Sequence, residues 1–171
     1  MCRWCIPTTG PRFAALGVTA NIQPLWACLD QQMVPLTIPF LAPERVAWQY
    51  PFGDLARAGV HLAAGSDWPV SSPNPLLAIH VAVNRWGYDE PGPAGSEAFL
   101  PEQRLTLEQA FAAYTSGSAF VNHLDEAGTL EVGKRADLAV LDRDPFAGDL
   151  AEVGAATVVA TFVDGSPVGR R

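Results

Sequence analysis

The chain has 171 residues, enough for one domain with a hydrophobic core but fewer than the about 200 to 250 that a complete eight-stranded β/α barrel takes. Its 11 Lys and Arg against 18 Asp and Glu give a net charge of -7, and the sequence has no run of basic residues. Nucleic acid and membrane surfaces are therefore disfavoured as partners. Every apolar run ends well short of the about 18 residues of a membrane span, which predicts a cytoplasmic protein.

The first 70 residues alternate between helix and strand patterns. The predicted elements are a helix ending over 11–16, a strand over 18–23, a loop over 25–50, a helix over 52–58 and a strand over 60–64. Gly17 and Gly59 end the two helices, and Pro24 ends the first strand. A helix between two strands favours a parallel pair, so we expect an α/β arrangement.

Two further helices have clear start signals. Asn74 is a predicted N-cap with Pro75 at the first helical position, opening a helix over 74–86. Thr106 and Gln109 have the spacing of a capping box, which predicts a helix over 106–116.

The pattern changes near residue 125, where glycines and short apolar runs replace the helices. We expect strands over 136–142 and 157–163, the second followed by an Asp164-Gly165 turn. This shift predicts a boundary that divides the chain into residues 1–124 and a small β unit over 125–171.

Asp67 is the main candidate for a functional residue. It closes an apolar run at Gly65-Ser66-Asp67, and Pro69 prevents the strand from continuing. At the carboxyl end of a parallel strand, such a carboxylate faces the catalytic end of a barrel. The alternative is that Asp67 only caps the turn after the strand, and the spacing alone leaves the two interpretations about even.

The cysteines and histidines do not suggest a second site. Cys2 and Cys5 form a lone C-x-x-C pair, more typical of a frayed terminus than of a metal knuckle. His61 lies at the opposite end of the strand from Asp67, about 20 Å away at about 3.3 Å per residue, so the two cannot share a metal. We expect His80 to pack in a helix and His123 to lie at a surface or boundary.

An ordered series of motifs resembles the C-terminal part of the amidohydrolase 3 family, in its YtcJ-like branch. The motifs are Gly65-Ser66-Asp67-Trp68-Pro69-Val70, Asn74-Pro75-Leu76, Leu105-Thr106-Leu107-Glu108-Gln109-Ala110, Tyr114-Thr115 and the run over 128–142. The resemblance covers about residues 11 to 168, and the series is more specific than any single motif.

The resemblance implies a fold, a metal and a reaction. The fold would be α/β, the C-terminal fragment of a metal-dependent (β/α)8 TIM barrel with strand seven over 18–23 and strand eight over 60–64, plus the returning part of a small β-sandwich. Asp67 would match the strand-eight aspartate that binds the metal, zinc in our expectation, or takes a proton from its water. The activity would be hydrolysis of non-peptide C–N bonds in small amides or formamides, with Trp68 as a substrate-facing ring.

The same comparison points to missing parts. The family's His-x-His and later histidine ligands have no counterpart here, and a catalytic zinc needs about three protein ligands. Residues 1–10 do not resemble the family's segment that carries the strand-six ligand. We therefore expect a truncated or frame-shifted product of a longer gene, or a mis-called start, and a chain that is inactive alone. Unpaired barrel edges would favour self-association. The alternative is a non-catalytic remnant or interaction module of the same fold.

Overall fold

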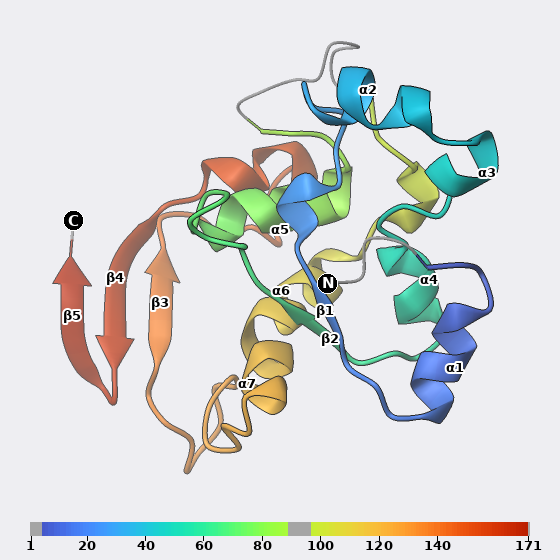
Figure 1. The fold of residues 1–171 in the computed structure, drawn as a ribbon. Coiled ribbons are helices and arrows are strands. Elements are labelled where there is room, and N and C mark those ends of the chain that lie inside the picture. The colour runs from blue at the N-terminus through green and yellow to red at the C-terminus, as the bar shows by residue number, and fades with distance from the viewer. Residues whose placement is uncertain (1–4, 89–96, 171) are drawn as a thin grey trace.

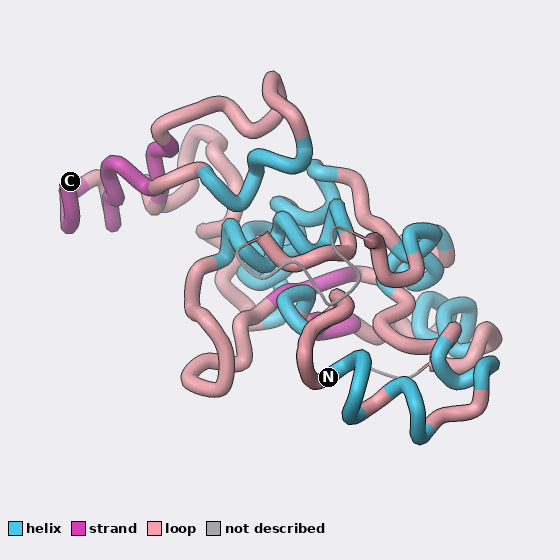
Figure 2. The backbone as a smooth tube through the Cα atoms, turned by 90° about the horizontal axis from the view of Figure 1, so that it is seen from above, coloured by secondary structure: helices cyan, strands magenta, loops and turns pink. Residues whose placement is uncertain are grey.

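The structure is a computed structural model that describes residues 5–88 and 97–170. Figure 1 shows a helical body around two short strands, with a separate three-stranded sheet of C-terminal residues beside it. The tube in Figure 2 shows the same separation from above, with the two central strands enclosed and the other three at one side. None of the helices in these two ranges is long and apolar enough to cross a membrane.

A parallel strand pair lies at the centre of the body. β1 (Ala20–Ile22) and β2 (Leu62–Ala64) run in the same direction, as predicted, with Ala20 opposite Leu62. The side chains of Ala20, Ile22 and Ala63 are buried. Both strands are shorter than the apolar runs that predicted them. Because they are parallel, their carboxyl ends lie at the same edge, where the candidate site is found.

Each strand is preceded by a helix that ends at a glycine. α1 (Thr9–Ala15) precedes Gly17, and α4 (Phe52–Arg57) precedes Gly59. The φ angles are 63° at Gly17 and 75° at Gly59, in the left-handed region that glycine adopts without a steric penalty. The predicted helix ends at these two positions are therefore confirmed.

The segment over 25–50 was predicted as a loop, and this was wrong in part. It contains four short helical elements, η1 (Pro24–Trp26), α2 (Met33–Leu36), η2 (Ile38–Phe40) and α3 (Pro43–Val46). Proline occupies one of the first two positions of η1, η2 and α3, where its missing N–H costs no hydrogen bond. The carboxylate of Asp30 accepts from the backbone N–H of Gln32 at 2.9 Å and of Met33 at 2.5 Å, and so holds the turn that leads into α2.

The two helices with predicted caps form as expected. α5 (Pro75–Asn84) begins with the Asn74 side chain accepting from the backbone N–H of Leu76 at 3.0 Å. α6 (Leu107–Ala112) begins with a complete capping box between Thr106 and Gln109. It runs on through a π-helical segment, Ala113–Gly117, into α7 (Ser118–Val121). This segment contacts the end of β2 and is important for the site.

A buried arginine ends α5, which the sequence did not predict. Arg85 has a φ of 68° and is 0% exposed. Its Nε donates to the carbonyl of Phe99 at 2.7 Å and its Nη1 to the carbonyl of Tyr50 at 3.2 Å, while its guanidinium lies over the rings of Phe52 and Phe99. Burial lowers the pKa of Arg85 to about 10, so it stays charged at neutral pH. The side chain thereby ties the backbone at Tyr50 to the end of α5.

The C-terminal residues form an antiparallel sheet in the order β3-β4-β5. Its strands are β3 (Leu138–Leu141), β4 (Val158–Val163) and β5 (Ser166–Arg170). The Asp164-Gly165 turn joins the last two strands as predicted, with φ angles of 47° and 74°. No strand was predicted after this turn, so β5 was missed.

Short 3-10 elements join the parts of the fold. η3 (Pro101–Gln103) precedes α6, and η5 (Leu150–Ala155) packs on α5. The side chain of Asn84 donates to the carbonyl of Leu150 at 2.7 Å, and Val153 belongs to the buried core. The segment before β4 is therefore anchored to the body by both polar and apolar contacts.

Candidate functional site

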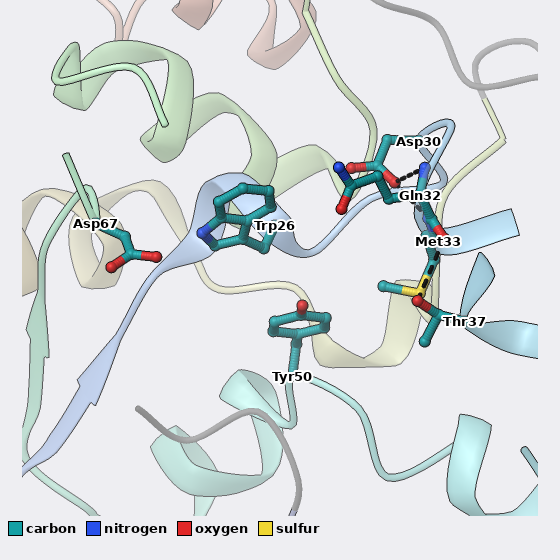
Figure 3. A pocket seen from close by; sticks show the side chains of 7 residues that line it. All are labelled: Trp26, Asp30, Gln32, Met33, Thr37, Tyr50 and Asp67. Atoms are coloured by element: carbon teal, nitrogen blue, oxygen red, sulfur yellow. Dashed lines mark hydrogen bonds between the residues drawn. The ribbon is translucent and has the colours of Figure 1, made fainter. Parts of the chain in front are cut away.

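A pocket lies at the carboxyl ends of β1 and β2. It has a volume of about 230 Å³. Its lining residues come from three segments, the one after β1, the one before α4 and the one after β2, and are Trp26, Asp30, Gln32, Met33, Thr37, Tyr50 and Asp67. Figure 3 shows Trp26 between Asp67 on one side and Tyr50 on the other, with Met33 and Asp30 further along. This volume is below the about 300 to 1,000 Å³ of typical ligand pockets, so the described walls alone enclose room for a very small group only.

The loop after β2 presents the carboxylate of Asp67 to this pocket. Asp67 has a φ of 63°, a left-handed conformation that aspartate adopts more readily than most residues. The turn is held by its neighbours, because Ser66 Oγ accepts from the N–H of Trp68 at 3.2 Å and the carbonyl of Asp67 accepts from the N–H of Val70 at 2.9 Å. Among the described residues, no hydrogen bond or ion pair engages the Asp67 carboxylate. A turn-capping role is therefore performed here by Ser66.

The π-helical segment fixes the strand end that carries Asp67. Ser118 Oγ donates to the carbonyl of Ala64 at 2.9 Å, and Tyr114 Oη donates to the carbonyl of Gly65 at 3.2 Å. Gly117 lies so close to β2 that an added Cβ would be 2.0 Å from the carbonyl oxygen of Leu62. π-helical turns often occur at functional sites. Here the wider turn brings one hydroxyl group to Ala64, the last residue of β2, and another to Gly65, which follows it.

We predict that Tyr114→Phe lowers the free energy of unfolding by about 1 kcal/mol, because the carbonyl of Gly65 loses its donor. Burial raises the pKa of Tyr114, so the hydroxyl stays protonated and able to donate across the neutral range. Urea denaturation followed by circular dichroism measures the change. Thr115→Val is the control, since the hydroxyl of Thr115 donates within its own helical segment, to the carbonyl of Phe111, rather than to the end of β2. Equal effects of the two variants would contradict the prediction.

The other aromatic and histidine candidates lie at different places. Trp68 follows Asp67 in the chain but is 67% exposed, and the lining of the pocket includes Trp26 instead. His61 precedes β2, at the end away from Asp67, and its ring is 4.3 Å from that of Phe120. The predicted separation of His61 from Asp67 along the strand agrees with this placement.

His80 and His123 have the structural roles expected of them. His80 is 1% exposed in α5, its Nδ1 is 3.2 Å from the side-chain nitrogen of Asn84, and its ring contacts Trp86 and Tyr88. His123 is exposed just after α7 with a φ of 57°. Of the predicted cysteine pair, Cys2 lies outside the described residues and Cys5 is half-buried.

The described residues do not by themselves form a catalytic metal site. A catalytic zinc takes about three protein ligands, and residues 5–88 and 97–170 hold no group of three His, Cys, Asp or Glu side chains placed to share one ion. In the pocket, the second carboxylate, that of Asp30, already accepts two backbone hydrogen bonds. The chemistry that can be assigned to the described residues is that of one carboxylate, an acceptor of protons and hydrogen bonds.

Trp26 and Tyr50 are pocket residues that the sequence analysis did not identify. Trp26 ends η1, which follows directly after β1. Residues that follow two parallel strands lie at the same edge of the sheet. Trp26 could have been selected on this ground as a residue near Asp67. Tyr50 reaches the pocket through the packing of 25–50, for which the sequence has no comparable signal.

The mixed α/β fold, with a carboxylate at the shared carboxyl edge of two parallel strands, is that of a known protein family. A family model described as "Amidohydrolase family" matches residues 2–168. The chain belongs to this family, which confirms the resemblance predicted from the motifs. The match begins at residue 2, so the expectation that the first ten residues lie outside the resemblance was wrong.

Curated relatives are similar over most of this chain. It is 35% identical to Protein LONG AFTER FAR-RED 3 of Arabidopsis thaliana over 93% of the chain and 26% of the relative. It is 30% identical to the Putative amidohydrolase YtcJ of Bacillus subtilis (strain 168) over 92% of the chain and 29% of the relative. An N-substituted formamide deformylase of Arthrobacter pascens is 33% identical over 68% of the chain and 20% of its own length. The chain thus spans between a quarter and a third of the first two relatives.

Solved structures show the same fold. An uncharacterized metal-dependent hydrolase from Pyrococcus horikoshii is 28% identical, with a TM-score of 0.72 over 87% of this chain and 29% of that one. Atrazine chlorohydrolase TrzN from Arthrobacter aurescens, solved in complex with zinc, is 19% identical, with a TM-score of 0.62 over 99% of this chain and 35% of that one. The described residues therefore adopt part of an amidohydrolase fold.

Proposed function

We propose that this chain is the C-terminal part of a hydrolase that cleaves non-peptide C–N bonds in small amides or formamides. The observation that carries the proposal is the carboxylate of Asp67, which is engaged by no described partner and lines a small pocket at the carboxyl ends of two parallel strands. Family membership and the formamide deformylase relative support the reaction class.

The proposed role of Asp67 is proton transfer. In amide hydrolysis, the oxygen of water bonds to the carbonyl carbon, the C–N bond breaks, and one proton from water moves to the leaving nitrogen. A carboxylate beside the reacting group can accept that proton and return it. By the family resemblance Asp67 is also a proposed ligand of a divalent metal, with the remaining ligands on polypeptide outside the described residues and Trp68 as a second ring near the substrate.

The proposal extends to the arrangement of the fold. We assign β1 and β2 to strands seven and eight of the barrel and the residues after about 125 to the small β-sandwich. Within the described residues β1 and β2 pair only with each other, so each has an open edge. Open edges favour pairing with another chain or with the rest of a barrel, which supports inactivity of this part alone and self-association when it is isolated.

The test uses the native protein from its source, captured with an antibody against residues 106–116. Its intact mass and its hydrolysis of formanilide to formate and aniline are measured together, before and after a chelator and after Zn²⁺ is added back. We expect a mass above 18.2 kDa, hydrolysis, loss of hydrolysis with the chelator and recovery with Zn²⁺. A captured protein that cleaves neither formanilide nor a panel of linear and cyclic amides, with or without Zn²⁺, would overturn the proposal in favour of a non-catalytic module.

A further inference from the structure

Tyr50 is held in an unusual backbone conformation at the wall of the pocket. Its φ is 47°, in the left-handed region, where a bulky residue is an outlier. A conformation of this kind persists only where the surrounding contacts fix it, and such residues cluster at functional sites. Tyr50 is 5% exposed and lines the pocket, so the strained residue belongs to the candidate site.

Arg85 supplies contacts that fix this conformation. Its Nη1 donates to the carbonyl of Tyr50 at 3.2 Å, while its Nε donates to the carbonyl of Phe99 at 2.7 Å. The guanidinium carbon lies 5.5 Å from the ring centre of Phe52 and 5.7 Å from that of Phe99. These contacts use two donors and the flat faces of one planar group. The ammonium of a lysine, which is a compact point charge, cannot reproduce them.

Phe52 extends the contact from the backbone of Tyr50 to its ring. The rings of Tyr50 and Phe52 pack edge to face, with centres 5.9 Å apart. The N–H of Phe52 also donates to the carbonyl of Tyr50, at 2.8 Å. Arg85 therefore acts on Tyr50 in two ways, directly at the carbonyl and through the ring of Phe52.

The ring of Tyr50 lies at the end of the pocket away from the candidate catalytic carboxylate. In Figure 3, Asp67 and Tyr50 lie on opposite sides of Trp26. A side chain at that end contacts a part of the substrate that does not react. It therefore contributes to the choice of substrate rather than to proton transfer.

We infer that Tyr50 limits the size of the substrate group that this pocket accepts, and that Arg85 is the positioning residue that holds Tyr50 in place. The inference rests on the proposed function and adds a specificity-determining residue to it. Without the contacts from Arg85, the left-handed turn at Tyr50 relaxes and its ring leaves the wall. The pocket then accepts a larger group.

The first test compares substrate preference in variants of the protein at its native length. Formanilide is compared with N-naphthylformamide, which is larger on the nitrogen, and with benzanilide, which is larger on the acyl carbon. One of the two places its larger group at Tyr50, whichever way the substrate lies. The ratio of kcat/KM for formanilide to that for each larger amide is independent of the fraction of folded enzyme. A merely structural role therefore leaves both ratios unchanged.

Tyr50→Gly and Arg85→Lys should each lower one of these ratios by about tenfold or more, because small differences in size at a pocket wall give about 10- to 200-fold discrimination. Glycine accepts the left-handed backbone and removes the ring. The double variant should lower the ratio no further than Tyr50→Gly, because Arg85 then has no ring to position.

Arg104→Lys is the matched control for Arg85→Lys. The Nε of Arg104 donates to the carbonyl of Asn84 at 3.3 Å, and its guanidinium lies over the ring of Trp86. The contacts are of the same kind and lie at the same end of α5, but neither Asn84 nor Trp86 lines the pocket. Both ratios should stay at the parent values.

A fluorine signal reports the position of the ring without catalysis. The protein is labelled with fluorotyrosine, and Tyr50→Phe identifies the signal of Tyr50 by its loss. The signal of a buried fluorine shifts little between light and heavy water. We expect a small shift for Tyr50 in the parent and in Arg104→Lys, and a larger one in Arg85→Lys.

The outcomes separate this inference from the proposed function. Unchanged ratios in Tyr50→Gly, additive effects in the double variant, or a Tyr50 fluorine signal that is the same in Arg85→Lys would each overturn the inference. If Arg85→Lys does not fold, Phe52→Leu replaces it, since this variant removes the ring between Arg85 and Tyr50. If the protein cleaves no amide, the proposed function fails, and the fluorine signal alone decides whether Arg85 positions Tyr50.

Discussion

Asp67→Asn is expected to lower the rate of C–N hydrolysis by the native protein by about 1000-fold or more. Positioned acid–base groups contribute about 100- to 10,000-fold, and an amide in place of the carboxylate can neither accept a proton nor return one. The substitution is nearly isosteric and the side chain is exposed, so the fold should be retained. The measurement is kcat and KM for formanilide, with the loss expected in kcat.

Asp30→Asn is the matched control for that experiment. It removes the same charge from the same pocket, but its side-chain oxygen can still accept from the N–H groups of Gln32 and Met33 at the start of α2. We expect a change of only a few-fold. If Asp30→Asn loses as much activity as Asp67→Asn, the loss is caused by the lower negative charge of the pocket. The proposal that Asp67 itself transfers the proton would then be wrong.

The position of Asp67 was predictable because a strand end is encoded locally. The local signals lie within a dozen residues, namely the apolar run, the glycine that opens it and the proline that closes it. The structure agrees with them. The same holds for the caps of α5 and α6, where Asn74 and Thr106 form the hydrogen bonds that their spacing predicted. Short-range hydrogen bonds are specified by spacing alone.

The other pocket walls depend on contacts between distant segments. Trp26 and Tyr50 meet Asp67 only after 25–50 has folded into short helical elements, so no single window of sequence contains the site. Arg85 is a stronger case, since a charged residue at a helix end is ordinarily interpreted as exposed. Its burial follows from two backbone carbonyls and two rings that long-range packing brings to it.

β5 was missed for a different reason. Pro167 lies inside this strand, and proline argues against a central strand because it lacks an N–H. β5 is at the edge of the sheet, next to β4 only, and an edge strand can accommodate a residue without a donor. The sequence analysis assigned no element after the Asp164-Gly165 turn, although a turn of this kind joins two strands and proline is allowed in an edge strand.

Gly117→Ala is expected to lower the free energy of unfolding by about 3 kcal/mol, although helix propensity alone favours alanine by about 1 kcal/mol. The φ of Gly117 is -66°, so the backbone itself accepts a side chain. The new Cβ would be 2.0 Å from the carbonyl oxygen of Leu62, a backbone atom of β2 that no rotamer change can move. Overpacking costs about 1 to 3 kcal/mol or more, so the clash outweighs the propensity.

Gly148→Ala is the control for this prediction. Its φ is not in the left-handed region, and its added Cβ meets only the carbonyl oxygen of Asp144, at 3.9 Å. We expect its free energy of unfolding to change by less than about 0.5 kcal/mol in the same urea titration. A Gly117→Ala protein as stable as Gly148→Ala would mean that the π-helical segment packs less closely on β2 than the structure has it.

The cost of Gly117→Ala should extend to the candidate site. Relief of the clash moves the π-helical segment away from β2, and the hydroxyls of Tyr114 and Ser118 then lose the carbonyls of Gly65 and Ala64. The amide of Gly65, which donates to the carbonyl of Ile22 at 3.0 Å, should exchange its hydrogen faster than in the parent chain. If the variant is destabilised but the Gly65 amide exchanges its hydrogen at an unchanged rate, the helical segment does not position Asp67. The close approach at Gly117 would then contribute to packing alone.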